Sequence, residues 1–157
     1  MTFYDGTTSL GSAAVSSGKA TKSVALGVGT HQLKAVFAPS SSAYVGSTSP
    51  VVKVTVTKST TTTSVSMSKW TVKKGSTVKA TVTVKGATAA PSGKVTIKKG
   101  TTVIGTGGTL KVSGTTGTAT ITLPTNLAVG KHSLTVSYAG SSGTAASSRT
   151  VTLTVTK

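Results

Sequence analysis

TFYDGTTSLG at residues 2–11 returns as TIKKGTTVIG at residues 96–105, with both glycines in the same places. Two further pairs follow in the same order along the chain: VGTHQLKAVF (28–37) with VGKHSLTVSY (129–138), and VTVTK (54–58) with LTVTK (153–157). Internal similarity of this kind is typical of a tandem array of small modules.

The two copies differ in what precedes them. Residues 59–94 come before the second copy and read as two additional strands, whereas the first copy has no such segment in front of it. We therefore predict two domains. Residues 1–58 form a partial domain with C-terminal strands only, and residues 59–157 form a complete domain.

Apolar and polar residues alternate with a period of two, as in STVKATVTVK at residues 76–85. This pattern is typical of antiparallel sheets with one buried and one wet face, and no stretch shows a helical period. We expect strands near residues 2–5, 8–15, 19–26, 30–38, 50–57, 62–67, 76–85, 94–99, 101–105, 108–113, 117–123, 131–139 and 149–156. This number of short strands predicts an all-β fold of tandem Ig-like sandwiches, the first lacking its N-terminal A–B strands.

Three segments carry a family resemblance: TFYDGTTSLGSAAVSSGKAT (2–21), LGVGTHQLKAVF (26–37) and YVGSTSPVVKVTVT (44–57). They resemble bacterial immunoglobulin-like repeats, group 3 type, of secreted and cell-surface proteins. The resemblance implies a non-catalytic spacer or adhesive module of a stalk, located outside the cell or on its surface. Phage structural proteins carry such repeats too, so a virion location is an alternative. One departure from the family pattern is Lys22, which stands where an inward apolar residue is usual.

A first domain without strand B would lack about four inward side chains, worth roughly 4–8 kcal/mol of burial. A small domain has only about 5–15 kcal/mol of stability in total, so residues 1–58 should not be stable alone. Three explanations stay open: the chain is a fragment of a longer array, a neighbouring chain or upstream segment donates the missing strands, or residues 1–58 fold as a reduced half-sandwich.

The residue types present argue against catalysis and metal binding. Asp5 is the only acidic side chain and there is no cysteine, so paired carboxylates, calcium sites and thiolate metal sites are not expected. Asp5-Gly6 is typical of a hairpin turn. His31 and His132 both follow a VGxH turn, and we interpret them as corner residues rather than catalytic bases. We predict no enzyme activity, no cofactor and no metal.

Charge is the other unusual feature. The chain carries a formal net charge of +16, with five lysines and one aspartate in residues 1–58 against eleven lysines and one arginine in the rest. The electrostatic field of so large a positive charge attracts polyanions, so a polyanion-binding module for cell-wall polymer or polysaccharide is the alternative function. The candidate patch consists of Lys73, Lys74, Lys79, Lys85, Lys94, Lys98 and Lys99. The single arginine and the scarcity of aromatics disfavour nucleic acid, and no apolar run is long enough to span a membrane.

Overall fold

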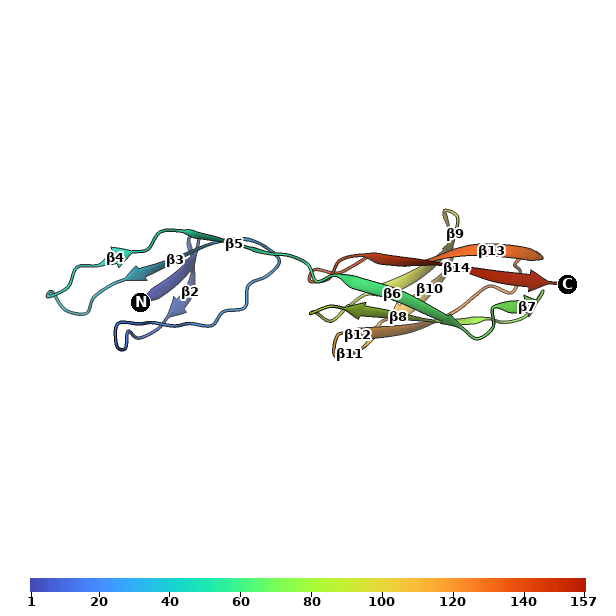
Figure 1. The fold of residues 1–157 in the computed structure, drawn as a ribbon, viewed down its shortest axis with the longest axis horizontal. Coiled ribbons are helices and arrows are strands. Elements are labelled where there is room, and N and C mark those ends of the chain that lie inside the picture. The colour runs from blue at the N-terminus through green and yellow to red at the C-terminus, as the bar shows by residue number, and fades with distance from the viewer. The chain divides into compact units, whose positions relative to one another are not determined.

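The computed structural model describes residues 1–157, which form fourteen β-strands and no helix (Figure 1). The chain divides into two compact units, residues 1–57 (unit 1) and residues 58–157 (unit 2). The prediction of an all-β chain is confirmed.

Unit 2 is a sandwich of two sheets. One sheet has the order β10-β9-β13-β14-β7 and the other has the order β11-β12-β8-β6. Their bounds are β6 Thr61–Met67, β7 Thr71–Lys73, β8 Lys79–Gly86, β9 Lys94–Lys99, β10 Thr102–Thr109, β11 Lys111–Ser113, β12 Thr116–Thr122, β13 Gly130–Tyr138 and β14 Ser147–Thr156. The sheets enclose a core made of alternate residues, for example Ala80, Val82 and Val84 of β8, each 0% exposed. Period-two alternation thus places the small apolar side chains inside and the threonines and lysines outside.

β7 is a strand that alternation did not predict. It runs parallel to the C-terminal strand β14, with Val72 paired to Val155. The amide of Thr154 also donates to the carbonyl of Trp70, just before β7. With three residues, β7 is too short to show a periodic pattern, and its position depends on β14.

Unit 1 has a single five-stranded sheet. β1 Thr2–Asp5, β2 Thr8–Ser12, β3 Gly29–Phe37 and β4 Ser47–Thr48 lie in the order β2-β1-β3-β4, and β5 Val52–Val56 also pairs with β3. β4 and β5 together occupy the edge that β14 fills alone in unit 2. Pro50 separates them, because proline has no amide hydrogen to donate to a ladder. The hydroxyl of Ser49 instead accepts the amide of Ala35, at 2.9 Å.

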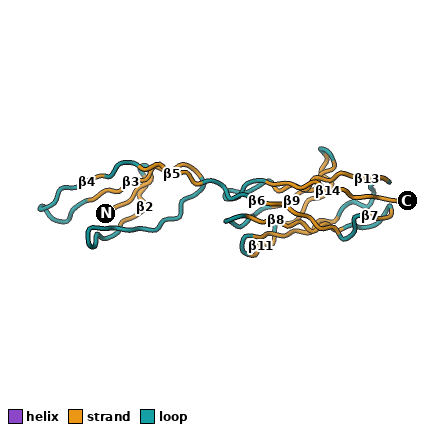
Figure 2. The backbone as a smooth tube through the Cα atoms, in the orientation of Figure 1, coloured by secondary structure: helices purple, strands orange, loops and turns teal.

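The prediction of a strand at residues 19–26 is wrong. Between β2 and β3 the chain forms only one isolated bridge, between Ser16 and Lys19, and Figure 2 shows this segment as loop. Its counterpart in unit 2 is β12, which pairs along its whole length with β8. Unit 1 has no strand equivalent to β8. A strand is stabilised by its neighbour's backbone groups, so the same kind of sequence remains irregular here.

The two units nevertheless share one register. Asp5 of β1 lies opposite Leu33 of β3, and Lys99 of β9 lies opposite Leu134 of β13. Burial differs sharply: no residue of unit 1 is buried, whereas most inward residues of unit 2 are. One template is therefore present twice, with both sheets in unit 2 and one in unit 1.

Candidate functional site

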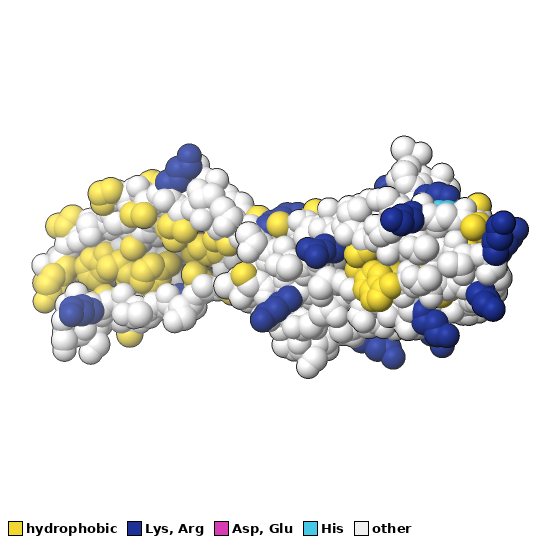
Figure 3. Space-filling model, turned by 45° about the vertical axis from the view of Figure 1, so that its right-hand side comes forward, with side chains coloured by type: hydrophobic (Ala, Val, Ile, Leu, Met, Phe, Trp, Pro, Cys, Tyr) yellow, Lys and Arg dark blue, Asp and Glu magenta, His cyan; other side chains and the backbone are white.

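Unit 1 presents the inner face of its sheet to solvent, and we call this surface the open face. Phe3 of β1, Leu33 and Ala35 of β3 and Val52 of β5 line a hollow of about 310 Å³ there. Hydrophobic side chains gather over unit 1 in Figure 3, whereas basic side chains stand out on the visible face of unit 2. Contiguous exposed apolar surface on a small unit is typical of an interaction site.

Unit 2 shows what normally covers this face. Ile97, Leu134 and Val136 occupy the positions of Phe3, Leu33 and Ala35, and each is 0% exposed. They are buried because the second sheet packs on them. The open face is thus a core surface without its other layer.

Lys22 reaches over this face. A Cβ placed on Gly11 would lie 2.8 Å from Cε of Lys22. At the matching place in unit 2, a Cβ placed on Gly105 would lie 2.7 Å from Cγ2 of Ile121. The aliphatic stem of Lys22 therefore lies over Gly11 as buried Ile121 lies over Gly105, but it carries a charge. Gly105 is needed for this close approach, since a side chain there would collide with Ile121, whereas Gly11 has a φ of 100°, a backbone conformation that favours glycine.

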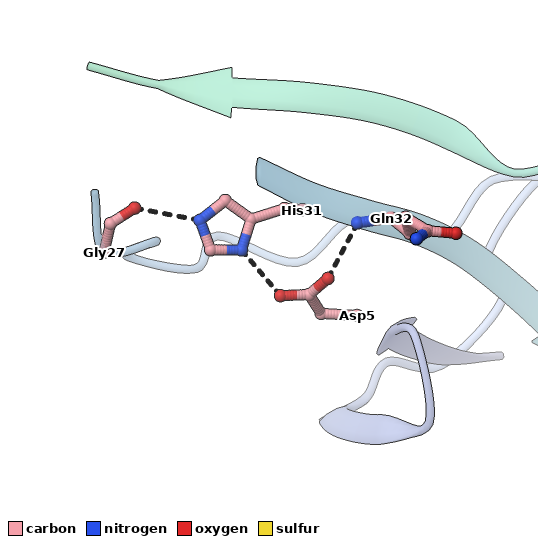
Figure 4. Close-up of polar contacts among 4 residues, drawn as sticks. All are labelled: Asp5, Gly27, His31 and Gln32. Atoms are coloured by element: carbon pink, nitrogen blue, oxygen red, sulfur yellow. Dashed lines mark hydrogen bonds and ion pairs between the residues drawn. The ribbon is translucent and has the colours of Figure 1, made fainter. Parts of the chain in front are cut away.

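Asp5 and His31 form the other notable group of unit 1 (Figure 4). Nδ1–H of His31 donates to Oδ2 of Asp5 at 2.6 Å, and Nε2–H donates to the carbonyl of Gly27 at 2.8 Å. The amide of Gln32 donates to Oδ1 of Asp5 at 2.8 Å. The hydrogen bond to Asp5, helped by that to Gly27, raises the pKa of His31. The hydrogen bond from His31, helped by the Gln32 amide, lowers the pKa of Asp5.

His132 repeats this corner in unit 2, but only in part. Its Nε2–H donates to the carbonyl of Ala128 at 2.7 Å, four residues upstream, as His31 does to Gly27. Its buried Nδ1 has no hydrogen-bonding partner in the protein. The residue at the position of Asp5 is Lys99, which cannot accept a hydrogen bond. Both histidines thus hydrogen-bond to the turn that precedes their strand.

The hydrogen bonds of His31 do not suit the role of a catalytic base. Both ring nitrogens are engaged, one by Asp5 and one by Gly27, so the ring has no free nitrogen to take a proton from a nucleophile. No three His, Cys, Asp or Glu side chains lie together in the structure. Asp5-Gly6 forms the β1–β2 turn as predicted, with Gly6 at a φ of 58°.

Tyr138 makes a polar network that the alternation pattern did not reveal. This buried residue donates its hydroxyl to the carbonyl of Ser92 at 2.9 Å and accepts the Ser92 amide at 3.2 Å. The hydroxyl of Thr144 lies 2.7 Å from the Tyr138 oxygen. These hydrogen bonds connect the turn at residues 139–144 to Ser92, just before β9. In unit 1 the corresponding residue is Phe37, which has no hydroxyl.

The seven candidate lysines do not form the single patch that was predicted. Lys79 and Lys85 project from β8, outward from the sheet β11-β12-β8-β6. Lys94 and Lys98 project from β9, outward from the other sheet. The two outer faces of a sandwich look in opposite directions, so these pairs cannot meet one ligand surface. The remaining members lie at strand ends and turns: Lys73, Lys74 and Lys99.

Trp70 and Tyr4 are the aromatic residues that bear on nucleic-acid binding, and they belong to different units. Trp70 lies in unit 2 and is 46% exposed, so it does not cap the core. Tyr4 belongs to unit 1, where Nζ of Lys34 lies 5.7 Å from its ring centroid.

Comparison with known proteins identifies the fold family. The family profile of the bacterial Ig-like domain (group 3) matches residues 1–57 and again residues 60–156. A search of curated proteins finds no match. Among solved structures, the fibronectin(III)-like modules of Clostridium thermocellum CbhA are similar, with 21% identity and a TM-score of 0.49 over 99% of this chain and 76% of that chain. The structure contains no helix able to cross a membrane. The two profile matches span nearly the whole sequence, and the chain belongs to the bacterial Ig-like domain (group 3) family.

Proposed function

We propose that this chain is a non-catalytic spacer segment of a bacterial surface or secreted protein, part of a stalk or adhesin. Residues 59–157 serve as a complete Ig-like domain and residues 1–58 as a partial one. The observation that carries the proposal is the parallel pairing of β7 with β14 in unit 2.

The strand arrangement within unit 2 suits a part that bears tension. Its chain enters through Lys58 and leaves at Lys157, at the end of β14. Force between these two points pulls the parallel strands β7 and β14 past each other. Their hydrogen bonds must then break together rather than one at a time, which resists extension.

Single-molecule force spectroscopy on the full chain tests this role. Unit 2 should unfold in one resolved event that releases about 3.3–3.6 Å of contour length per residue. As a variant, Val72→Pro removes one β7 amide hydrogen and should lower the unfolding force. Gradual extension of unit 2 without a resolved event would argue against a role under tension.

Location needs a separate experiment. Brief protease treatment of intact producer cells should release peptides of this chain into the supernatant, with a cytosolic protein as the control for lysis. Recovery of the peptides in purified phage particles would instead support the virion alternative.

The basic surface favours a second candidate function, the binding of an anionic polymer. The chain carries 17 basic side chains against one acidic one, which attracts polyanions at low salt. Retention on immobilised heparin should fall steeply with salt if several phosphate- or sulfate-like contacts are made. Weak retention that does not change with salt would indicate that the lysines only keep the protein soluble.

A further inference from the structure

The outer face of the sheet β11-β12-β8-β6, which we call the β8 face, carries only hydroxyl and ammonium groups. Lys79, Thr81, Thr83 and Lys85 project outward from β8, between side chains of the core. The outward positions of β12, the even-numbered residues 116–122, are all threonine, and those of β6 are Thr or Ser. Because the strands pair in register, these side chains lie in rows across the sheet. The β8 face is thus a polar array with a lysine near each end of its inner strand.

A hollow of about 330 Å³ lies beside this array. Thr81, Thr118, Thr120 and Lys111 are among the residues that line it. Thr120 lies opposite Thr81, and Lys111 lies opposite Thr118, so three hydroxyls and one ammonium group are neighbours there. A hydroxyl can donate or accept a hydrogen bond, whereas an ammonium group can only donate. The hollow therefore suits a ligand that has both anionic oxygens and hydroxyl groups.

The outer face of the other sheet, which we call the β9 face, has the same chemistry. Lys94, Thr96 and Lys98 project outward from β9 between buried residues. Lys131 projects outward from β13, where Thr135 lies opposite Lys98. The other outward positions of β13 and β14 are Ser or Thr. Unit 2 thus has two arrays of lysine and hydroxyl groups, one on each sheet.

No acidic side chain neutralises these lysines. The one acid of the chain, Asp5, belongs to unit 1, where it makes the only ion pair, with His31. The lysines cannot turn to a common side, because residues between them, such as Val82 on β8 and Ile97 on β9, are 0% exposed. The core of the sandwich separates the two faces, which look in opposite directions. Each face can therefore attract an anionic chain of its own.

Aromatic side chains are missing from both faces. Unit 2 has two aromatic residues, Tyr138, which is 1% exposed in the core, and Trp70, which precedes the edge strand β7. Nucleobases are held by stacking on aromatic side chains, and sugar rings pack on them in a similar way. A polymer of glycerol phosphate has no ring to stack. Its phosphates can meet the lysines, and its hydroxyls can meet the threonines and serines.

We propose that the β8 face and the β9 face each bind a chain of glycerol phosphate polymer, so that one copy of unit 2 bridges two chains. The proposal rests on the second candidate function, polyanion binding, and adds the polymer class and the bridging. On the β8 face the polymer runs along β8, where Lys79 and Lys85 lie about 20 Å apart. Each phosphate contact releases a counterion, so both sites weaken as salt is added.

The test of two sites uses the full chain and a short glycerol phosphate oligomer that spans one face. The first variant replaces the lysines of the β8 face: Lys79→Gln, Lys85→Gln and Lys111→Gln. The second replaces those of the β9 face: Lys94→Gln, Lys98→Gln and Lys131→Gln. The matched control loses the same charge outside the strands: Lys69→Gln, Lys74→Gln and Lys157→Gln.

In calorimetric titration at low salt, each face variant should bind one oligomer fewer than the wild type, and the control should bind the same number. None of the replaced lysines is buried, so the urea midpoint followed by Trp70 fluorescence should stay unchanged in all variants. Equal stoichiometry in the wild type and either face variant would overturn the proposal. An equal loss in the control would attribute binding to net charge and would overturn it too.

Bridging is measured by energy transfer between long glycerol phosphate polymers that carry donor and acceptor dyes on separate chains. The wild type and the control should bring the chains together, whereas either face variant should lower the transfer at least about fivefold. Binding without transfer would overturn bridging and leave polyanion binding intact. Transfer retained by both face variants would trace it to contacts between copies of the protein and would also overturn bridging.

The polymer class is tested with a polygalacturonate oligomer of equal charge, which has a sugar ring at every carboxylate. It should bind at least about threefold more weakly than the glycerol phosphate oligomer. Equal or tighter binding would assign the two faces to an acidic polysaccharide and overturn the polymer class. If neither oligomer binds at low salt, both this proposal and the second candidate function are wrong.

Discussion

Oδ2 of Asp5 lies 2.6 Å from Nδ1 of His31, so the one acidic side chain of this protein is paired with a corner histidine 26 residues away. The pairing joins the end of β1 to the start of β3. It also makes the stability of unit 1 dependent on pH, because the contact is an ion pair only while Asp5 is deprotonated and His31 is protonated.

The first prediction concerns that dependence. The raised pKa of His31 stabilises unit 1 below the ordinary histidine value of 6.5, and this contribution is lost as pH rises through the folded-state pKa. The lowered pKa of Asp5 stabilises unit 1 above the ordinary value of 3.8, and this contribution is lost as pH falls through the folded-state pKa. Unit 1 should therefore be most stable between these two ordinary values. NMR titration of the His31 ring should give a pKa above 6.5 that falls in Asp5→Asn. An identical His31 titration in both proteins would contradict the assignment.

The second prediction transfers the pair to unit 2. Lys99 occupies the position of Asp5, opposite Leu134, and Nδ1 of buried His132 has no partner. Lys99→Asp should supply the acceptor and raise the free energy of unfolding by about 1 kcal/mol. Urea denaturation followed by the fluorescence of Trp70, the single tryptophan, measures this. Lys98→Asp makes the same change of charge on the outer face, and an equal effect of the two would attribute the gain to net charge alone.

The third prediction compares equivalent leucines. Leu134 is 0% exposed in a closed sandwich, so Leu134→Ala should cost about 2–5 kcal/mol of unit 2 stability. Leu33 lines the open face, so Leu33→Ala should cost less than half as much. Trp70 fluorescence reports unit 2, and amide exchange of β1 and β3 reports unit 1. Comparable costs at the two positions would mean that the open face is covered in solution.

The fourth prediction concerns the hydroxyl of Tyr138. Tyr138→Phe leaves the Ser92 carbonyl and the Thr144 hydroxyl short of a partner inside unit 2, at a cost of about 1–3 kcal/mol. The reverse change, Phe37→Tyr in unit 1, should alter stability by no more than about 0.5 kcal/mol, because the new hydroxyl can reach water. Urea midpoints at pH 7 measure both changes in stability. An unchanged midpoint for Tyr138→Phe would show that the turn is held by its backbone hydrogen bonds alone.

Much of the fold could be predicted because it is encoded locally. The alternation at residues 76–85 placed Ala80, Val82 and Val84 inside β8, and the repeated VGxH turn marked both histidine corners. The candidate basic site could not be predicted in the same way. Alternation shows that Lys79 and Lys98 both point outward, but it does not show that they belong to opposite sheets.

The sequence by itself determined the duplication, the all-β class, the family and the inward or outward direction of most strand residues, because these depend on spacing along the chain. Tertiary structure alone decided that residues 19–26 form no strand, that Lys22 lies over Gly11 and that Asp5 meets His31. The physical reason is that a strand or a hydrogen bond needs a partner from elsewhere in the chain. Unit 2 contains β8 as the partner of β12, and unit 1 contains no such strand.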